Sequence, residues 1–274
     1  MSKKKFLIID GFSLMFRAFY SFPPTLTLPD NTPINAAFGF ITLAFKAIDQ
    51  FNPSHICICF DRPEPTFRKK KFPEYKAHRP PPPDDFKVQI PILYTIIQAL
   101  GLPHIDLTGY EADDLIGTLA TIKHTPPNGG HTLLLTNDQD CFQLVTDSVS
   151  VAMSRKGISN LVEYTSEKVT EKLGVLPSQV IDYKALRGDA SDNIPGVKGI
   201  GEKTAVALLK EYGTLEAIYK NLDTLSSKSV QKKLKENREN AYLSQELATI
   251  ICNVPINQDL SRYTYTPNWT QIIE

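Results

Sequence analysis

The chain has 274 residues, 42% hydrophobic and 22% charged, a composition typical of a soluble globular protein that buries a sizeable core. Lys plus Arg and Asp plus Glu both number 30, so the net charge identifies no class of partner. No apolar stretch is long enough to predict a membrane helix, and Asp10 interrupts the apolar run near the N-terminus, which argues against a signal peptide. The four cysteines lack zinc-ligand spacing and predict a reducing, cytoplasmic setting.

Aspartates follow three short apolar stretches of strand type. The stretches and their acids are 6–9 with Asp10, 55–60 with Asp61, and 131–136 with Asp138 and Asp140. The carboxyl ends of strands in an open α/β sheet are where ligands bind. A single Asp-Gly pair also makes a good turn, but chance is a poor explanation for three strands that all end in acid.

Periodic segments elsewhere predict helices that alternate with strands. We expect helices over 36–51, 84–100 with a kink at Pro91, 111–122, 166–173, 177–186, 203–210, 215–221, 228–236 and 240–249, and strands over 149–153 and 162–164. This order predicts an α/β fold with a central, mostly parallel sheet flanked by helices. Residues 266–274 look like the beginning of another helix, so we expect the chain to be part of something longer.

Further carboxylates are paired at helical spacing. Glu111 and Asp114 stand three positions apart with Asp113 beside them, and Asp189 and Asp192 repeat the spacing. Side chains three positions apart share one face of a helix. Acid at a helix N-terminus commonly complements the helix dipole, but three carboxylates in four residues exceed what that purpose needs.

Residues 62–83 are the least globular part of the sequence, with seven Lys or Arg against two Glu and a closing run of four prolines. A solvated, mobile loop is one explanation. Because Phe67, Phe72 and Tyr75 alternate with the basic residues, the segment also suits an arch that grips a single strand by charge and by stacking on bases.

A glycine-rich hairpin directly follows Asp192. Its glycines let backbone amides approach a neighbour closely, and a helix N-terminus binds anions. Residues 188–212 therefore predict a helix-hairpin-helix that contacts nucleic-acid phosphates without reading sequence. The candidate DNA contacts are Gly196, Lys198, Gly199, Gly201 and Lys203. Each half of the motif also has an ordinary explanation. GDASDN could be an Asx-rich turn, and GVKGIG could be a linker between helices.

Nine carboxylates form the candidate metal site. They are Asp10, Asp61, Glu111, Asp113, Asp114, Asp138, Asp140, Asp189 and Asp192. With few cations expected among them, they would repel one another unless protons or metal ions neutralise them. Oxygen ligands without Cys or His clusters select Mg²⁺ or Mn²⁺ over Zn²⁺. Two such ions about 4 Å apart suit phosphoryl chemistry, so the predicted reaction is hydrolysis of a phosphodiester.

Seven ordered motifs resemble the 5′-nuclease or flap endonuclease family, which includes the 5′-3′ exonuclease domain of bacterial DNA polymerase I and phage 5′-exonucleases. The motifs are LIIDGFSLMFRAFY, CFDRPEPTFR, YKAHRPPPPDDF, GYEADDLIGTLA, LTNDQDCFQLV, GDASDNIPGVKGIGEKTA and NRENAYLSQELATI. The resemblance covers almost the whole chain. It implies a PIN/Rossmann-like nuclease core over 1–180, with a basic arch at 62–83, and a helical DNA-binding unit over 181–274 with the hairpin at 188–212.

The resemblance also implies roles for individual residues. The ligands of a first metal ion would be Asp10, Asp61, Glu111, Asp113 and Asp114, and those of a second would be Asp138, Asp140, Asp189 and Asp192, with some sharing. The arch residues that act on the 5′ strand and scissile phosphate would be Arg68, Lys76 and Arg79, with Tyr75 among the DNA contacts. The hairpin resembles the family's duplex-binding element, where a K⁺ ion is an option.

Two departures from the family pattern remove no ligand. Gln139 stands where a lysine is common, and Arg62 where a small residue is frequent. The resemblance therefore implies a Mg²⁺-dependent 5′-3′ exonuclease and flap endonuclease with two Mg²⁺ ions, or Mn²⁺ as an alternative, in RNA primer removal and DNA repair. The expected partners are DNA with a 5′ flap, nick or 5′ end, an RNA primer and a polymerase domain in the same polypeptide. We expect a monomer that contacts no membrane.

Two other functional classes compete with a nuclease. A DNA-junction-binding module would use only the hairpin and the arch, but binding of polyanionic DNA would favour loss of the acids. A metal-dependent phosphatase on a similar sheet would leave the hairpin and the basic arch without a purpose.

Overall fold

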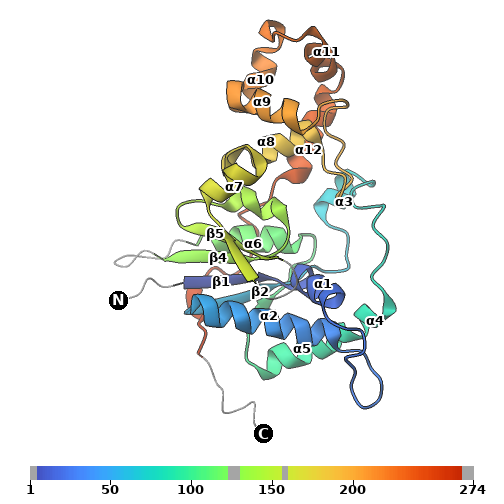
Figure 1. Ribbon diagram of the computed structural model, residues 1–274, viewed down its shortest axis with the longest axis vertical. Coiled ribbons are helices and arrows are strands. Elements are labelled where there is room, and N and C mark those ends of the chain that lie inside the picture. The colour runs from blue at the N-terminus through green and yellow to red at the C-terminus, as the bar shows by residue number, and fades with distance from the viewer. Residues whose placement is uncertain (1–4, 123–129, 156–159, 267–274) are drawn as a thin grey trace.

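A six-stranded sheet with helices on both faces forms the larger part of the computed structural model, which describes residues 5–122, 130–155 and 160–266 (Figure 1). The strands are β1 Lys5–Asp10, β2 His55–Cys59, β3 His104–Ile105, β4 His131–Leu135, β5 Val149–Arg155 and β6 Asn160–Tyr164. Their order is β3-β2-β1-β4-β5-β6, and every neighbouring pair is parallel except β5 and β6. The predicted α/β fold with a mostly parallel sheet is confirmed.

The described α-helices follow the expected order. They are α1 Gly11–Ser21, α2 Asn35–Phe51, α3 Phe67–Lys71, α4 Asp84–Lys87, α5 Gln89–Ala99, α6 Ala112–Ala120, α7 Ser166–Leu173, α8 Val180–Arg187, α9 Glu202–Tyr212, α10 Leu215–Lys220, α11 Lys228–Glu236 and α12 Arg238–Ala248. Short 3-10 turns lie at Gln139–Leu144, Pro177–Gln179, Leu222–Thr224 and Leu260–Tyr263.

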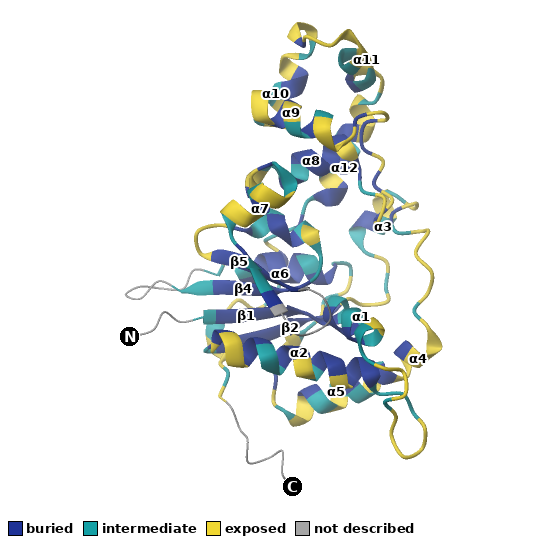
Figure 2. Ribbon diagram, viewed as in Figure 1, coloured by how far each residue is buried: buried dark blue, intermediate teal, exposed yellow. Residues whose placement is uncertain are grey.

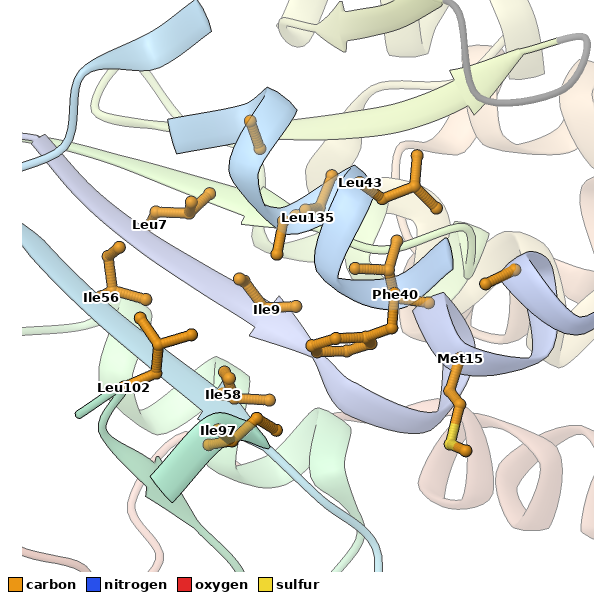
Figure 3. Close-up of a cluster of buried hydrophobic side chains, with 14 of the residues drawn as sticks. Leu7, Ile9, Met15, Phe40, Leu43, Ile56, Ile58, Ile97, Leu102 and Leu135 are labelled. Atoms are coloured by element: carbon orange, nitrogen blue, oxygen red, sulfur yellow. The ribbon is translucent and has the colours of Figure 1, made fainter. Parts of the chain in front are cut away.

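Alternate residues of the central strands enter two separate cores. Leu7 and Ile9 point into a cluster that includes Phe40 of α2, and Figure 3 shows these side chains together. Phe6 and Ile8 point to the opposite face, which α6 covers. Because both faces are buried, β1 is a nearly continuous apolar run, as parallel strands usually are.

Two local predictions differ from the structure. Helix α1 begins directly after β1, where the sequence suggested a turn, and Asp10 caps it by accepting a bond from the Ser13 amide at 3.1 Å. The expected helix over 84–100 is divided at Val88 into α4 and α5. Pro91 explains the division, since proline has no amide hydrogen and its ring opposes the carbonyl of Lys87 four positions earlier.

A helical unit stands beyond one end of the sheet, and the sides of α8 and α12 that face each other are buried (Figure 2). Its own core includes Leu186, Leu209 and Leu234. After α12 the chain returns to the sheet, where the Tyr263 ring stacks on Phe6 with the ring centroids 5.6 Å apart. The division at residue 180 remains a prediction, and the helix expected over 266–274 falls almost wholly outside the described residues.

No helix in the described part of the chain is both long enough and apolar enough to cross a membrane.

Candidate active site

The central strands bring the acidic residues to one edge of the sheet. The strand order changes direction at β1, because β2 lies on one side of it and β4 on the other. Such a switch point leaves a crevice at the carboxyl ends of the strands, where ligands bind. Asp10 ends β1 there and is 5% exposed. The Thr136 hydroxyl, just after β4, donates to the second oxygen of Asp10 at 2.7 Å.

Five carboxylates line the cavity in this crevice. Four of them form the group that we call the inner acids, whereas the fifth, Glu111, pairs with Lys76. The inner acids are Asp10, Asp61, Asp113 and Asp138, and the cavity has a volume of about 220 Å³. Burial, and then the charge of Asp61, raises the pKa of Asp10 to about 7. Burial also raises the pKa of Asp113 well above its ordinary value, and the charges of Asp138 and Asp10 add to the effect. The charge of Lys76 only partly offsets these effects on Asp113, so a bound cation would supply the rest of the compensating charge.

A second pair of carboxylates shares one lysine. Lys184 of α8 donates to Asp189 at 2.6 Å and also to Asp140. Burial alone would raise the pKa of Asp189, but Lys184 outweighs it and the pKa falls to about 2. This pair lines a cavity of about 370 Å³ that meets the first cavity at Asp138 and Arg79.

The arch places its own cations on two further acids. The Lys76 ammonium lies 2.8 Å from Glu111 and 3.6 Å from Asp192, and the Arg79 guanidinium also pairs with Asp192. The Tyr75 hydroxyl lies 3.1 Å from both Glu111 and Asp192. Burial alone would lower the pKa of Lys76, but Glu111, Tyr75 and Asp192 raise it well above its ordinary value. The expectation that few cations stand among the nine carboxylates is therefore wrong.

Backbone contacts hold the arch against the turn that precedes the hairpin. The Lys76 amide donates to the Asp192 carbonyl at 2.9 Å, and the Asn193 side chain donates to the Glu74 carbonyl at 2.8 Å. Arg79 also reaches the Ser191 carbonyl at 3.0 Å. Segments that are more than 100 positions apart in the sequence thus meet beside the carboxylates.

Asp189 and Asp192 do not share a helix face. Residues 189–194 form a tight turn in which the Asp189 and Ile194 backbones pair as an isolated bridge. Asp189 consequently faces Lys184, whereas Asp192 faces the arch. Both acids therefore reach the site from a turn. The helix that their i, i+3 spacing predicted is not formed there.

Three residues that were predicted to act on metal or DNA have structural roles in this structure. Arg68 is 2% exposed and forms a two-pronged ion pair with Asp114, with both N–O distances at 2.8 Å. Asp114 is fully buried and also accepts from the Ile251 and Glu111 amides, so both of its oxygens are occupied. Tyr75 is 3% exposed, which leaves its ring no face for stacking on a base.

The glycines of the hairpin also fall into two groups, because Gly196 is buried whereas Gly199 and Gly201 are exposed. Gly196 is buried and its amide donates to the Ser244 hydroxyl at 2.9 Å, so this amide is not free for a phosphate. A Cβ at Gly196 would lie 2.3 Å from the Gly188 nitrogen, which explains why glycine is required. The exposed residues around the start of α9 are Lys198, Gly199, Gly201, Glu202 and Lys203.

A divalent cation fits the chemistry of the inner acids. Among the described residues, no three carboxylate, imidazole or thiol groups already form a metal cage. Carboxylate oxygens are nevertheless the ligands that Mg²⁺ and Mn²⁺ prefer. Asp10 and Asp113 are also close enough to other acids for those acids to raise their pKa values. Asp10, Asp61, Asp113 and Asp138 would hold such an ion.

Sequence reasoning missed two site residues. Thr136 directly follows β4, and its hydroxyl also accepts from the Asp138 amide at 3.0 Å, so it links two inner acids. Lys184 lies between apolar neighbours on the buried side of α8. A lone lysine at a position that helical periodicity predicts to be buried is a signal that could have identified it.

Two family models cover the chain almost completely. The model described as "5′-3′ exonuclease, N-terminal resolvase-like domain" matches residues 5–174, and "5′-3′ exonuclease, C-terminal SAM fold" matches residues 175–271. DNA polymerase I of Caldicellulosiruptor bescii is 46% identical over 259 residues, which are 93% of this chain and 30% of that protein. A 5′-3′ exonuclease of Bacillus subtilis is 40% identical over 269 residues, 97% of this chain and 90% of that protein.

Solved structures agree on the fold. T5 5′-exonuclease bound to divalent zinc ions matches with a TM-score of 0.75 at 22% identity, over 90% of both chains. The catalytic core of Rad2 in complex with a DNA substrate matches with a TM-score of 0.59 at 18% identity, over 98% of this chain and 85% of that chain. From the two family models and the sequence relatives, the chain belongs to the 5′-3′ exonuclease family.

Proposed function

We propose that this chain is a divalent-metal-dependent 5′ nuclease that hydrolyses phosphodiester bonds at DNA 5′ ends and 5′ flaps. The observation that supports the proposal is the set of inner acids. They line one cavity near the carboxyl ends of β1 and β4, and burial together with neighbouring acids raises the pKa values of Asp10 and Asp113. Membership of the 5′-3′ exonuclease family supports it. Because the chain spans about 30% of its DNA polymerase I relatives, the activity of a whole polymerase is not implied.

The reaction would divide into tasks for separate groups. Divalent ions held by the carboxylates would lower the pKa of an attacking water and stabilise the charge that develops on the phosphate. Thr136 would orient Asp10 for this task by donating to its carboxylate, and it also accepts from the backbone amide of Asp138. Lys76 and Arg79 stand next to the same cavity and would bind the phosphate oxygens once Glu111 and Asp192 release them.

The exposed start of α9 would bind the duplex part of the substrate. Lys198 and Lys203 flank exposed backbone there, and Lys233 of α11 adds a cation by donating to the Gly199 carbonyl at 3.0 Å. Phosphate contacts of this kind fix the position of DNA without reading its sequence. We include a K⁺ ion at this hairpin in the proposal, because backbone carbonyl oxygens are hard ligands.

The remaining assignments belong to the same proposal. The ions would be two Mg²⁺, with Mn²⁺ as an alternative, held by the inner acids together with Asp140, Asp189, Asp192 and Glu111. The nuclease core would span 1–180 and the DNA-binding unit 181–274. The protein would act as a cytoplasmic monomer on DNA flaps, nicks and RNA primers, next to a polymerase domain.

Cleavage of a labelled 5′-flap DNA tests the proposal. We expect cutting near the flap junction with Mg²⁺, no cutting with EDTA, and a loss of at least about a hundredfold in rate for Asp189→Asn. The matched control is Asp147→Asn, because Asp147 is exposed and precedes β5 at the opposite edge of the sheet. This control should cut at the wild-type rate.

Two outcomes would contradict the proposal. Tight binding of the flap without cutting in Mg²⁺ or Mn²⁺ would favour the junction-binding module. Turnover of small phosphate esters in place of DNA would favour the phosphatase.

A further inference from the structure

Lys184 is a buried amine between two carboxylates of the proposed metal site. Its side chain is 7% exposed, and its ammonium pairs with Asp140 and, at 2.6 Å, with Asp189. It lies in the last turn of α8, where the helix dipole favours a positive charge. Burial of an ammonium is costly unless it is paired, so the position of Lys184 depends on these acids.

The surroundings of Lys184 are rich in charge. Asp138 lies in the same cavity, and Lys184 is the main group that lowers its pKa against the effect of burial. Arg79 and Arg187 also line this cavity, but Arg79 pairs with Asp192 and Arg187 is exposed and lies over the Tyr183 ring. Lys184 is therefore the cation that serves Asp140 and Asp189 directly.

A comparison with Arg68 shows what kind of cation Lys184 is. The Arg68 guanidinium bonds to the carbonyls of Leu247 and Thr249 as well as to Asp114, which makes it a fixed link between segments. In the described part of the chain, both bonds of the Lys184 ammonium go to cavity carboxylates. A lysine is a compact point charge on a flexible stem, so its ammonium can move where a guanidinium fork cannot.

We propose that Lys184 is a positioning residue that acts as the resident counter-ion of Asp140 and Asp189. Without metal, its ammonium holds the two carboxylates together at the wall of the cavity. A divalent ion that binds these carboxylates must displace the ammonium. Lys184 therefore lowers the affinity of Asp140 and Asp189 for a divalent ion. This inference rests on the proposed function, which makes Asp140 and Asp189 metal ligands.

Calorimetric titration of Ca²⁺ into the DNA-free protein tests the inference, together with thermal unfolding in EDTA. Lys184→Met removes the charge and keeps the apolar stem, Lys184→Arg keeps the charge, and Lys220→Met changes an exposed lysine of α10 as a control. We expect Lys184→Met to bind Ca²⁺ about tenfold more tightly or better, because a positive charge next to the ion is gone. Its unfolding temperature in EDTA should fall. Lys184→Arg and Lys220→Met should stay within about threefold of wild-type affinity.

Wild-type or weaker Ca²⁺ affinity in Lys184→Met would overturn the counter-ion role, provided that the wild type binds Ca²⁺. A wild type that binds no Ca²⁺ would overturn the ligand assignment in the proposed function as well, so the two failures differ. If Lys184→Met does not fold in EDTA, the double variant Lys184→Met with Asp189→Asn distinguishes a role in charge from a role in packing. It removes one charge of each sign and so leaves the net charge of the cluster unchanged. This double variant should fold, and its failure would show that Lys184 is needed for packing and not for charge.

Discussion

At the scale of single residues, the carboxylates of the site differ in what faces them. Asp140, Asp189, Asp192 and Glu111 pair with lysine or arginine, whereas the inner acid Asp10 is faced by other acids. A buried carboxylate without a cation prefers to be protonated, and one with a cation prefers to be ionised. A bound metal ion should therefore stabilise the ionised form of Asp10 more than that of the paired carboxylates.

Asp10 makes the stability of the metal-free protein depend on pH. Its pKa rises from 3.8 when unfolded to about 7 in the folded protein, so the folded state binds this proton more tightly. The unfolding free energy should therefore fall as pH rises from 4 to 7 and then level off. Asp10→Asn should abolish up to about 4 kcal/mol of that fall.

Urea unfolding at several pH values in EDTA measures the effect. Asp147→Asn, which changes an exposed acid, should keep the wild-type pH dependence. Added Mg²⁺ should restore the wild-type stability at pH 8, because the metal replaces the proton. An identical pH dependence in Asp10→Asn and in the wild type would contradict the assignment.

At the scale of elements, the hairpin depends on a close approach of two backbone segments. Gly188 ends α8 and Gly196 lies in the following turn, and both have positive φ angles. The Val197 amide donates to the Leu186 carbonyl at 2.9 Å, so the hairpin is tied to the end of α8. The Asp189–Asp192 turn is enclosed between these contacts, and its shape therefore depends on the glycines.

Gly196→Ala should destabilise the hairpin by more than backbone strain alone. Gly101 is a matched control, because it has the same φ of 62° but open space, with no contact within 4 Å, where a Cβ would stand. Gly101→Ala should cost about 1–2 kcal/mol, the usual penalty for a left-handed backbone. Gly196→Ala should cost more, since its Cβ meets the Gly188 backbone, and should also slow flap cleavage. Equal losses of unfolding free energy in chemical denaturation would refute the packing argument.

At the scale of the whole molecule, Arg68 connects the arch, the sheet and the helical unit. It belongs to α3, pairs with Asp114 of α6, and donates to the carbonyls of Leu247 and Thr249 at the end of α12. The candidate active site lies where these three parts meet. Tight connection of the parts keeps the carboxylates of the sheet and those before the hairpin within one site.

Arg68→Met should strongly destabilise the protein. Removal of one partner of a buried ion pair leaves Asp114 uncompensated, which typically costs about 3–5 kcal/mol. Arg62→Met is the control, because Arg62 pairs with Glu64 and Asp106 near the surface, where a pair contributes about 0–1 kcal/mol. Chemical denaturation measures both variants. Near-equal unfolding free energies for the two would show that Arg68 is not a structural link.

Patterns in the sequence were enough to predict five of the six strands, a mostly parallel sheet and the acids that follow three of the strands, whereas β3 and the strand order were not predicted. The predicted features depend on local periodicity and on turn residues that are close together in the chain. The hairpin was also predictable, because glycine is the residue that tolerates positive φ. The order of the motifs was enough to identify the family.

The pairing of charged residues could not be predicted from the sequence, because it depends on contacts between distant segments of the folded chain. Arg68 reaches a carbonyl 179 positions away, and Arg79 reaches Asp192 across 113 positions. The family resemblance grouped Arg68 with Lys76 and Arg79 as DNA contacts, yet burial makes Arg68 structural and leaves the other two beside the cavity. The physical reason is that a charge acts on whatever lies within a few ångströms of it, and chain folding sets those neighbours.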